Sequence, residues 1–529
     1  MKIYRVIYTI LFFIIIILPL CFINVKPDQI SEIDNSKLPE ASEVKDIDSL
    51  ETYLSRRIGL RENIINSYTK INDILFNRMV HPTYTYGKEG YVFFKIEGEN
   101  RDNDYLDTFA SLVKKMQDYT EKRGIYFLFI INPTKISVYR EYLPAGYKYT
   151  DYRISYLKNK FDEIGVNYID NTDCLDAESN NRQVFNKKYD AGHWNDIGAF
   201  YGINNIYKKL KDDGIEISSL DISDYNIQYQ VEDTLPVSKF EIYEEVPKYY
   251  LNNKNYSITN KYQNHIDISD NHSYYIETNN EEVNNNYKLL FFRGSYMNNK
   301  EKFISNKFSQ AYLIHNYDNS INFDYYYNIT KPDIVLFETV EYAIAENYYS
   351  CNQIENREYN ESYENFKNLE EGKILDLMIE NDYDEKDNIV QTERKLSEKI
   401  LEKDYLRLYK PIYDFNYNCL EPYIKLYIDL LDSDNNDTIE RETSLEYGSN
   451  YIRTEINNNY DNKIPLTKIN LPKGDFKYAY LRVDGQIYDF CYNQSECYIT
   501  LDTELLYNKE IEIIVISQDL TLKQTIKID

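Results

Sequence analysis

The sequence is poor in tryptophan, histidine and cysteine, and these shortages narrow the chemistry that it can support. Its 529 residues include one tryptophan, five histidines and six cysteines. It has no Cys-x-x-Cys motif and no pair of histidines spaced to share one helical face. Because both patterns are typical of protein metal sites, we expect no bound metal and no cofactor. Cys491 and Cys497 are the one close pair, and a small disulfide loop there is the alternative to two free thiols, which we favour.

Positive charge is also scarce. Lysine and arginine together number 60, against 87 aspartates and glutamates, which gives a formal net charge of −27. Binding to nucleic acid or to an anionic lipid surface requires clustered basic side chains, so the balance argues against either as the main ligand. Hydrophobic residues make up 43% of the chain, enough for real cores, and its length predicts two or three folded units.

The N-terminus contains the one long uncharged run. After Lys2 and Arg5 comes "VIYTILFFIIIILPLCFINV", about twenty residues, which is long enough for a membrane-spanning helix. A cleaved signal peptide usually has a shorter apolar run and a small-x-small site, which are missing here. We therefore expect an uncleaved, single-pass anchor in the cell membrane, with the N-terminus cytoplasmic and the rest of the chain extracellular or periplasmic.

The remaining sequence divides by its patterning. A polar stalk is expected first, then a region of alternating helices and strands with a β-rich insertion, a charged linker, and a final region of alternating β-type segments that predicts a β-sandwich-like domain. The expected boundaries are 1–27 for the anchor, 28–49 for the stalk, 50–355 for the α/β domain with its insertion at about 215–285, 356–405 for the linker and 406–529 for the β domain.

The α/β pattern predicts an open parallel sheet. An amphipathic helix stops at Gly124 and is followed by the apolar run "IYFLFIINPTK", an order typical of parallel sheets. The same alternation recurs at "RISYLKNKFDEIG" with "VNYID", and at "YKLLFFRG" and "KPDIVLFETV". In such sheets ligands bind beyond the carboxyl ends of the strands.

Two of the expected strand ends carry reactive side chains. Ser295 follows the strand "LLFFR" on a sharp turn at Gly294, and "KYDAGHWNDIGAF" places Asp190 and His193 after "VNYID". A serine on such a turn can act as a nucleophile, with a histidine as base and an aspartate that orients the imidazole. The alternatives are a simple Gly-Ser turn and a buried histidine without a catalytic role.

Six motifs in order resemble one family. These are "SRRIGLRENIINSYTKINDILF", "GKEGYVFF", "INPTKISVYREYLPAG", "YDAGHWNDIGA", "FRGSYM" and "KPDIVLFETVE". They resemble the AlgX/AlgJ-type SGNH hydrolase-like family of cell-surface polysaccharide O-acetyltransferases, with related DHHW proteins of Gram-positive bacteria, over roughly residues 45 to 345. The family places its Asp-His motif before the nucleophilic serine, a circular permutation of the usual order that this chain keeps.

The resemblance implies a role for each candidate residue. Ser295 would be the nucleophile, His193 the general base and Asp190 its orienting partner. Ala191 and Gly192 separate the Asp from the His, where family members often have one residue, and "RGSY" is a shortened form of the usual nucleophile turn. Trp194 is expected as a packing or glycan-stacking neighbour. Asn132 is a candidate donor to the substrate, although a turn residue before Pro133 is the preferred interpretation.

The implied function is O-acylation of a surface polysaccharide. We expect a membrane-anchored extracytoplasmic O-acyltransferase, an O-acetyltransferase by resemblance, that works through an acyl-serine. A membrane-bound O-acyltransferase partner would deliver the acyl group to a site outside the cell. The alternatives are a carbohydrate esterase or deacetylase, and a non-catalytic glycan-binding surface protein. The β domain at 406–529 is a candidate carbohydrate-binding module.

Overall fold

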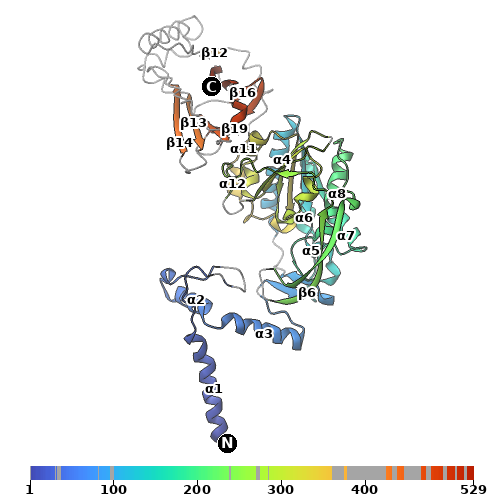
Figure 1. Ribbon diagram of the computed structural model, residues 1–529, viewed down its shortest axis with the longest axis vertical. Helices are drawn as coiled ribbons and strands as arrows, with labels where there is room; N and C mark the ends of the chain where they lie inside the picture. Colours follow the sequence, from blue (N-terminus) through green and yellow to red (C-terminus); the bar gives the residue numbers. More distant parts are fainter. Residues whose placement is uncertain are drawn as a thin grey trace.

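The computed structural model describes most of the chain to residue 359 and the strands of the C-terminal region (Figure 1). The described residues are 2–29, 31, 37–81, 83–95, 101–236, 240–269, 274–283, 285–359, 374–377, 424–431, 438–445, 466–471, 478–492, 497–506, 509–516 and 521–528.

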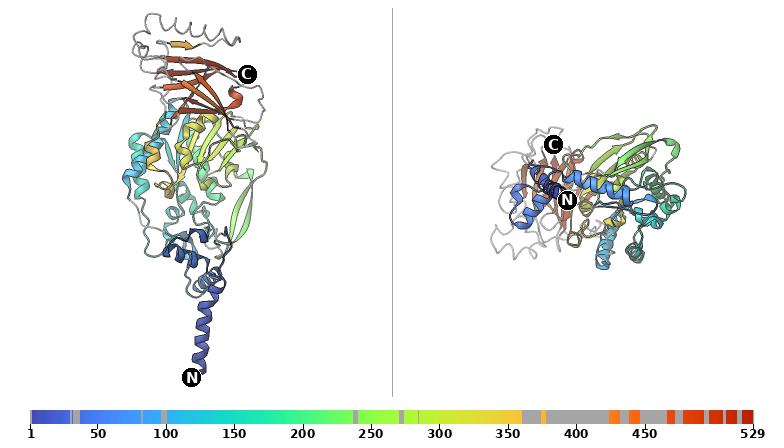
Figure 2. Two further views of the ribbon diagram at one scale, coloured as in Figure 1. Left: turned by 90° about the vertical axis from the view of Figure 1, so that its left-hand side faces the viewer. Right: turned by 90° about the horizontal axis from the view of Figure 1, so that it is seen from below.

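Helices form the N-terminal part of the chain. In order they are α1 (Lys2–Cys21), the short 3-10 helix η1 (Ala41–Glu43), α2 (Ile47–Arg57) and α3 (Arg61–Phe76). Helix α1 projects from one end of the molecule, and the C-terminal strands lie at the other end (Figure 2). Helices α2 and α3 are separated near Leu60, a residue with a left-handed backbone.

The prediction of a membrane anchor is wrong. Among the described residues, no helix combines the length and apolarity needed to cross a membrane. The predicted run counted uncharged residues as far as Val25, but α1 ends at Cys21 and its first turns contain Lys2 and Arg5. The uncharged helical part, Val6 to Cys21, is shorter than the about twenty residues that a span requires. The predicted localisation, with a cytoplasmic N-terminus and the rest outside, is contradicted with it.

A seven-stranded mixed sheet forms the centre of the α/β region. Its strands are β3 (Tyr126–Asn132), β4 (Tyr168–Asp170), β7 (Ser257–Ile258), β8 (Tyr275–Asn279), β9 (Lys288–Arg293), β10 (Gln310–His315) and β11 (Ile334–Val340). Their order is β4-β3-β11-β9-β10-β8-β7. The first five in this order pair in parallel, as predicted. Strands β3, β11, β9 and β10 are buried over most of their length, whereas β4 at the edge is only partly buried.

The prediction of a parallel sheet fails at one edge. Strand β8 pairs antiparallel with β10, and β7 pairs antiparallel with β8. Parallel neighbours need a crossover of a dozen or more residues, whereas the connection from β8 to β9 is shorter than that. The β-rich stretch near 215–285 therefore adds its last strands to the sheet in the opposite direction.

Helices cover the sheet and connect its strands. They are α4 (Asn103–Glu121), α5 (Lys135–Val138), α6 (Tyr152–Ile164), α7 (Thr172–Ser179), α8 (Asp196–Asp212), α9 (Glu301–Ile304), α10 (Asp318–Ile321), α11 (Phe323–Thr330) and α12 (Cys351–Glu355), with 3-10 turns η3 (Arg140–Tyr142), η4 (Ile222–Asp224), η6 (Ser295–Met297) and η7 (Glu341–Ala343). Helix α4 begins at Asp102, whose carboxylate accepts from the Tyr105 N–H, and packs its buried face against β3 and α6. Gly124, with φ +72°, follows it in the left-handed region that favours glycine.

Two β-hairpins lie beside the segment that carries Asp190 and His193. The first joins β1 (Tyr84–Tyr86) to β2 (Val92–Phe94) through η2 (Lys88–Gly90). The second joins β5 (Tyr225–Thr234) to β6 (Glu241–Leu251). Leu235 and Phe240, near the tip of the second hairpin, share a small apolar cluster with Val92 and with Ala191 of the Asp-His loop. Both hairpins therefore contact the segment that carries the candidate residues.

The C-terminal region is β-rich. Its described elements are β12 (Ile374–Leu377), β13 (Ile424–Leu431), β14 (Thr438–Leu445), β15 (Leu466–Leu471), β16 (Tyr478–Val483), β17 (Gln486–Asp489), β18 (Cys491–Tyr492), β19 (Cys497–Asp502), the short helix α16 (Thr503–Leu506), β20 (Lys509–Ile516) and β21 (Thr521–Ile528). They form two five-stranded sheets, β12-β21-β20-β16-β17 and β14-β13-β15-β19-β18. Cys491 and Cys497 are both buried, and no disulfide joins them. Of the predicted linker 356–405, only residues 356–359 and 374–377 are described, and its remainder lies outside the described residues.

The β-rich region packs directly on the α/β region. The Asp489 carboxylate accepts from the Arg123 Nε at 2.8 Å, and the Asp489 carbonyl accepts from the Asn328 side chain at 2.8 Å. Cys491 and Leu466 belong to the same apolar core as the central sheet. Arg123 and Asp489 are both largely buried, so this ion pair lies in a poorly hydrated contact. The predicted boundary near residue 355 stays a prediction.

The ion pair should contribute to the stability of the contact. Replacing Asp489 with alanine leaves the Arg123 guanidinium buried without its carboxylate, and we expect the free energy of unfolding to fall by about 3–5 kcal/mol. The matched control is Glu241→Ala, which removes a carboxylate from the exposed pair with Lys70 and should cost less than about 1 kcal/mol. Urea unfolding of the full chain, followed by circular dichroism, measures both. Equal losses in the two variants would contradict the expectation.

Candidate active site

Ser295 lies on the turn that leaves the central strand β9. The strand ends at Arg293, Gly294 makes the turn, and Ser295 opens the 3-10 helix η6. A β-carbon at Gly294 would approach the Asn316 amide and the Glu338 carboxylate to 3.3 Å each, which explains why glycine fits this tight turn. The serine hydroxyl therefore lies beyond the carboxyl end of β9, where the sequence predicted it.

Asp190 and His193 lie in the loop between α7 and α8. Asp190 has φ +53°, a left-handed conformation that aspartate tolerates better than most residues. Its carboxylate accepts from the backbone N–H groups of Gly192 at 3.2 Å and His193 at 3.1 Å. This Asx-type turn folds the loop back on itself. The two residues between Asp190 and His193, unusual for the family, therefore still bring the imidazole onto the carboxylate.

The three side chains form one continuous chain of contacts. The His193 Nδ1 lies 2.8 Å from both carboxylate oxygens of Asp190, and its Nε2 lies 2.9 Å from the Ser295 hydroxyl oxygen. The structure therefore brings together all three residues that the sequence proposed. Asp190 and Ser295 are separated by more than one hundred residues, and the imidazole between them links two distant loops.

Electrostatics fix the direction of these hydrogen bonds. Burial raises the pKa of the Asp190 carboxyl, but the hydrogen bond and charge of His193 and the two N–H donors outweigh it, so this pKa lies below its ordinary value. Asp190 is then ionised at neutral pH and can only accept. The His193 Nδ1 therefore carries the proton, and Nε2 is left to accept from the Ser295 hydroxyl.

Tyr342 is a neighbour of the serine that the sequence analysis missed. Burial raises the pKa of its hydroxyl to about 12 and an interaction with Ser295 opposes this rise, so the phenol stays neutral near pH 7. The residue is 40% exposed. Its position directly after β11 is the signal that could have identified it, because it ends a strand next to β9 in the sheet.

Trp194 and Tyr296 join the two loops. The Trp194 indole N–H donates to the Tyr296 carbonyl at 2.7 Å, and the Tyr296 hydroxyl donates to the Gly192 carbonyl at 2.6 Å. Each loop thus holds the backbone of the other through one aromatic side chain. Trp194 is only 2% exposed, so it serves packing rather than glycan stacking. A β-carbon at Gly202 of α8 would come within 2.5 Å of the indole, so the helix needs glycine there.

Asn132 lies below the site instead of facing it. It is fully buried, its Nδ2 donates to Glu338 at 2.7 Å, and its Oδ1 accepts from Asn171 at 2.7 Å. With these partners the amide is engaged inside the protein. The structure accordingly gives Asn132 a supporting contact, close to the turn role that the sequence analysis preferred over substrate binding.

The Asp-His loop is also supported from outside. Glu244 of β6 accepts from the backbone N–H groups of Lys187, Lys188 and Tyr189 at 2.5–2.6 Å. The buried Lys135 amine donates to the Lys187 carbonyl at 3.0 Å. The residues just before Asp190 are thus held by one carboxylate and one ammonium group.

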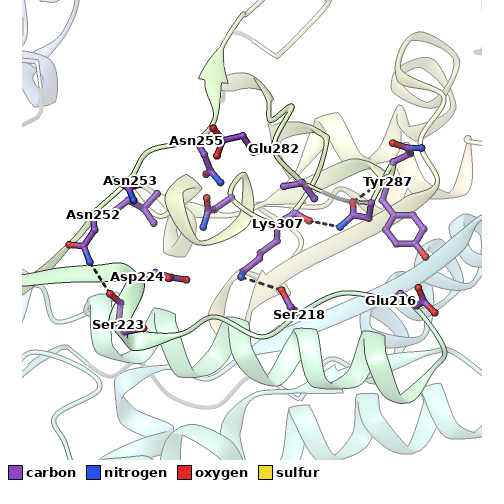
Figure 3. A pocket seen from close by; sticks show the side chains of 15 residues that line it. Glu216, Ser218, Ser223, Asp224, Asn252, Asn253, Asn255, Glu282, Tyr287 and Lys307 are labelled. Carbon is purple, nitrogen blue, oxygen red and sulfur yellow. Dashed lines mark hydrogen bonds between the residues drawn. The ribbon is translucent and has the colours of Figure 1, made fainter.

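A separate polar cavity lies at another part of the sheet. It measures about 870 Å³ and is lined by residues that include Asp224, Asn252, Glu282, Tyr287 and Lys307 (Figure 3). Tyr287 precedes β9, whereas Ser295 follows it, so the cavity belongs to the opposite end of that strand. None of its lining residues is part of the Asp190, His193 and Ser295 constellation.

The fold and this constellation define an SGNH hydrolase-like α/β domain. Residues 85–236 match the family model described as the SGNH hydrolase-like domain, acetyltransferase AlgX. The resemblance inferred from the six motifs is thereby confirmed. The matched segment contains Asp190 and His193, and Ser295 lies beyond it.

Several solved structures are similar to parts of the chain. PatB1 of Bacillus cereus with a sulfonyl adduct is 14% identical, with a TM-score of 0.38, and the match covers 48% of this chain and 95% of that one. A DHHW family protein from Eubacterium siraeum is 15% identical, with a TM-score of 0.39 and coverage of 54% and 99%. The O-acetyltransferase domain of Pseudomonas putida AlgJ is 12% identical, with a TM-score of 0.37 and coverage of 52% and 98%. Comparison with curated proteins gives no match.

The link between Trp194 and Tyr296 predicts a local effect of losing the indole N–H. Trp194→Phe leaves the buried Tyr296 carbonyl without this donor, which should lower the free energy of unfolding by about 1–3 kcal/mol. We also expect Ser295 to react about 2- to 10-fold more slowly with an aryl sulfonyl fluoride, because the turn that follows it loses a contact.

A matched control separates stability from positioning. Tyr207→Phe removes another buried donor, the Tyr207 hydroxyl, which donates to the Phe303 carbonyl at 2.6 Å. This bond lies away from the site. Its free energy of unfolding should fall by a comparable amount, and its Ser295 should be labelled at the normal rate. Mass spectrometry of the labelled peptide gives the rates. Normal labelling of folded Trp194→Phe would show that the contact does not position the serine turn.

Proposed function

We propose that the protein is an O-acetyltransferase that modifies a polysaccharide through an acyl-serine on Ser295. The observation that carries the proposal is the unbroken chain from Asp190 through His193 to the Ser295 hydroxyl. The match of residues 85–236 to an acetyltransferase family model supports acetyl as the group transferred. Polysaccharide as the acceptor class comes from the resemblance of the six sequence motifs.

The first half-reaction would load the serine. The Ser295 oxygen attacks the carbonyl carbon of an acetyl ester donor while its proton passes to the His193 Nε2. The bond between the carbonyl carbon and the donor oxygen then breaks, and the departing oxygen takes that proton from His193. Asp190 holds the imidazole and stabilises its positive charge during the transfer.

The second half-reaction would transfer the acetyl group. A sugar hydroxyl gives its proton to the His193 Nε2 and attacks the acetyl carbon. The bond from that carbon to the Ser295 oxygen breaks, and the serine regains a proton from His193. The products are an acetylated sugar and the original enzyme, so atoms and charge balance without a cofactor.

The negative charge on the substrate oxygen needs donors in both steps. The bonds from the Met297 N–H to the Gly294 carbonyl and from the Asn298 N–H to the Ser295 carbonyl begin η6, so the helix provides no acceptor for the N–H groups of Ser295 and Tyr296. The Tyr342 hydroxyl is a third neutral donor beside the serine oxygen. These groups would serve as the oxyanion donors.

An esterase uses the same residues, with water as the acceptor. His193 is about one-third exposed, so water has access to the imidazole that would activate it. Acetate release, measured against acetyl transfer to a soluble glycan from para-nitrophenyl acetate, distinguishes the two activities. Failure of a serine-directed reagent to label Ser295 would instead favour a non-catalytic glycan-binding protein. The membrane-bound acyltransferase partner expected from the resemblance stays a prediction.

The constellation should act as a unit. Ser295→Ala and His193→Ala should each lower the rate of acetyl transfer or release at least about 1,000-fold, and the double variant should be little worse than either. Asp190→Asn should cost as much or less, because an amide cannot stabilise the charged imidazole and favours the wrong tautomer.

The measurement is acetyl transfer and acetate release by the full chain, with folding checked by circular dichroism. Full activity of folded Ser295→Ala would end the covalent mechanism. Full activity of folded His193→Ala would show that the contact between Asp190 and His193 is structural and not catalytic.

A further inference from the structure

Both backbone polar groups of Gly294 are held by buried, charged side chains. The Gly294 N–H donates to the Glu338 Oε2 at 2.5 Å, and the Gly294 carbonyl accepts from the Arg293 Nη1 at 3.1 Å. Glu338 is 1% exposed and Arg293 is fully buried. A carboxylate and a guanidinium therefore hold the two backbone polar groups of the residue that immediately precedes Ser295.

Glu338 links this turn to three other elements. Its Oε1 accepts from the Asn132 Nδ2 at 2.7 Å, at the end of β3. The Asn132 Oδ1 accepts from Asn171 at 2.7 Å, and the Asn171 Oδ1 accepts from Asn205 of α8 at 3.0 Å. The Glu338 carbonyl accepts from the Asn316 side chain at 2.6 Å, beyond β10. A buried polar chain thus runs from α8 to the Gly294 turn.

Arg293 is fixed on the other side. Its Nη1 also donates to the Asn298 side chain at 2.6 Å, just after η6, and its guanidinium lies over the Tyr274 ring, 3.2 Å from the centroid. Among the described residues, no direct ion pair joins Arg293 to Glu338. Both charges instead contact the serine turn: Glu338 accepts from the Gly294 N–H, and the Arg293 Nη1 donates to the Gly294 carbonyl and the Asn298 side chain.

A buried carboxylate without a contacting cation is costly for folding. Burial raises the pKa of Glu338, and the hydrogen bonds from Gly294 and Asn132 oppose this rise because they favour the ionised form. An apolar residue would fill a position in β11 without that cost, as the residues at 334–337 do. The carboxylate is therefore better explained by what it holds than by the stability of the strand.

We propose that Glu338 is a positioning residue for Ser295. Its carboxylate fixes the Gly294 peptide, and with Arg293 it sets the directions of the Ser295 hydroxyl and N–H toward the acyl group. This inference rests on the proposed nucleophilic role of Ser295. Glu338 acts through Gly294 and makes no contact with the substrate.

The test replaces one hydrogen-bond acceptor of residue 338 with a donor and keeps the shape of the side chain. Glu338→Gln keeps the side-chain outline but turns one acceptor into an NH2 group, which must then face either the Gly294 N–H or the Asn132 Nδ2. If the Asn132 amide turns to accept from this NH2 group, it loses its bond from Asn171. In either arrangement the turn loses a contact, and we expect labelling of Ser295 by an aryl sulfonyl fluoride to slow about 10- to 100-fold. The kcat for acetate release should fall by a similar factor with little change in KM, because substrate contacts remain.

A second substitution should restore the contact. In the double variant Asn132→Asp/Glu338→Gln, the glutamine NH2 donates to the new carboxylate and its oxygen accepts from the Gly294 N–H. The second oxygen of that carboxylate still accepts from Asn171. We expect labelling to return to within about 5-fold of the wild-type rate, and the single variant Asn132→Asp, with two adjacent carboxylates, to remain slow.

Glu277→Gln is the matched control. Glu277 is a buried carboxylate in β8 of the same sheet, and it accepts from the Lys261 N–H at 2.9 Å and the Tyr275 hydroxyl at 3.0 Å. The free energy of unfolding in urea should fall in this variant as it does in Glu338→Gln. Ser295 should nevertheless be labelled at the wild-type rate. A loss of labelling in Glu277→Gln equal to that in Glu338→Gln would overturn the proposal, because general destabilisation would then explain both.

The outcomes separate this inference from the proposed function. Wild-type protein that does not label at Ser295 would count against the nucleophile itself. If Ser295 is labelled in the wild-type protein and equally fast in Glu338→Gln, only the proposed role of Glu338 is overturned. If Glu338→Gln does not fold, the double variant decides: restored folding and labelling support the pairing, and a folded double variant that labels slowly overturns it.

Discussion

The parallel pairing of β9 with β10 and β11 is the constraint on which the site depends. Register pairs Arg293 of β9 with His315 of β10, and Phe292 of β9 with Phe337 of β11. Because parallel strands end at the same edge, the residues at and just beyond their ends meet there: Gly294 and Ser295, Asn316, and Glu338 to Tyr342. No loop has to reach across the sheet to bring the serine near its supporting groups. The apolar burial that stabilises these strands therefore also sets the geometry of the turn.

The Asp-His loop does not follow a strand, so its position needs separate contacts. Helix α7 separates it from β4, and three interactions hold it: the reciprocal hydrogen bonds of Trp194 and Tyr296, the Glu244 carboxylate, and the start of α8 at Asn195. The Asn195 side chain accepts from the Gly198 N–H as the helix N-cap. Packing between the two loops thus explains why the single tryptophan lies beside a catalytic candidate. The tryptophan was conspicuous in the sequence because it is the only one.

Local patterns predicted the parts of the fold that local physics determines. The apolar runs of β3, β9 and β11 and the Gly-terminated helix α4 are readable because burial and backbone freedom act on neighbouring residues. Contacts between distant residues were not readable: Asn132 and Glu338 are 206 positions apart, and nothing near Asn132 indicates a buried carboxylate partner. The reversed direction of β8 and the extent of α1 were also missed, since strand direction depends on connections and an apolar run does not fix where a helix ends. The triad was predicted as residues, but its contacts appear only in three dimensions.

The exposure of the site bears on the choice between transfer and hydrolysis. The His193 and Asp190 side chains are 31% and 27% exposed, and Tyr342 is 40% exposed. Nothing in the chemistry of an acyl-serine discriminates between a sugar hydroxyl and water, because His193 would accept a proton from either. A partly exposed site therefore transfers its acyl group efficiently only if the acceptor binds over the serine and displaces water before attack. Selectivity for the polysaccharide would then reside in the surface around Tyr342, while the buried groups beneath Gly294 would serve both reactions equally.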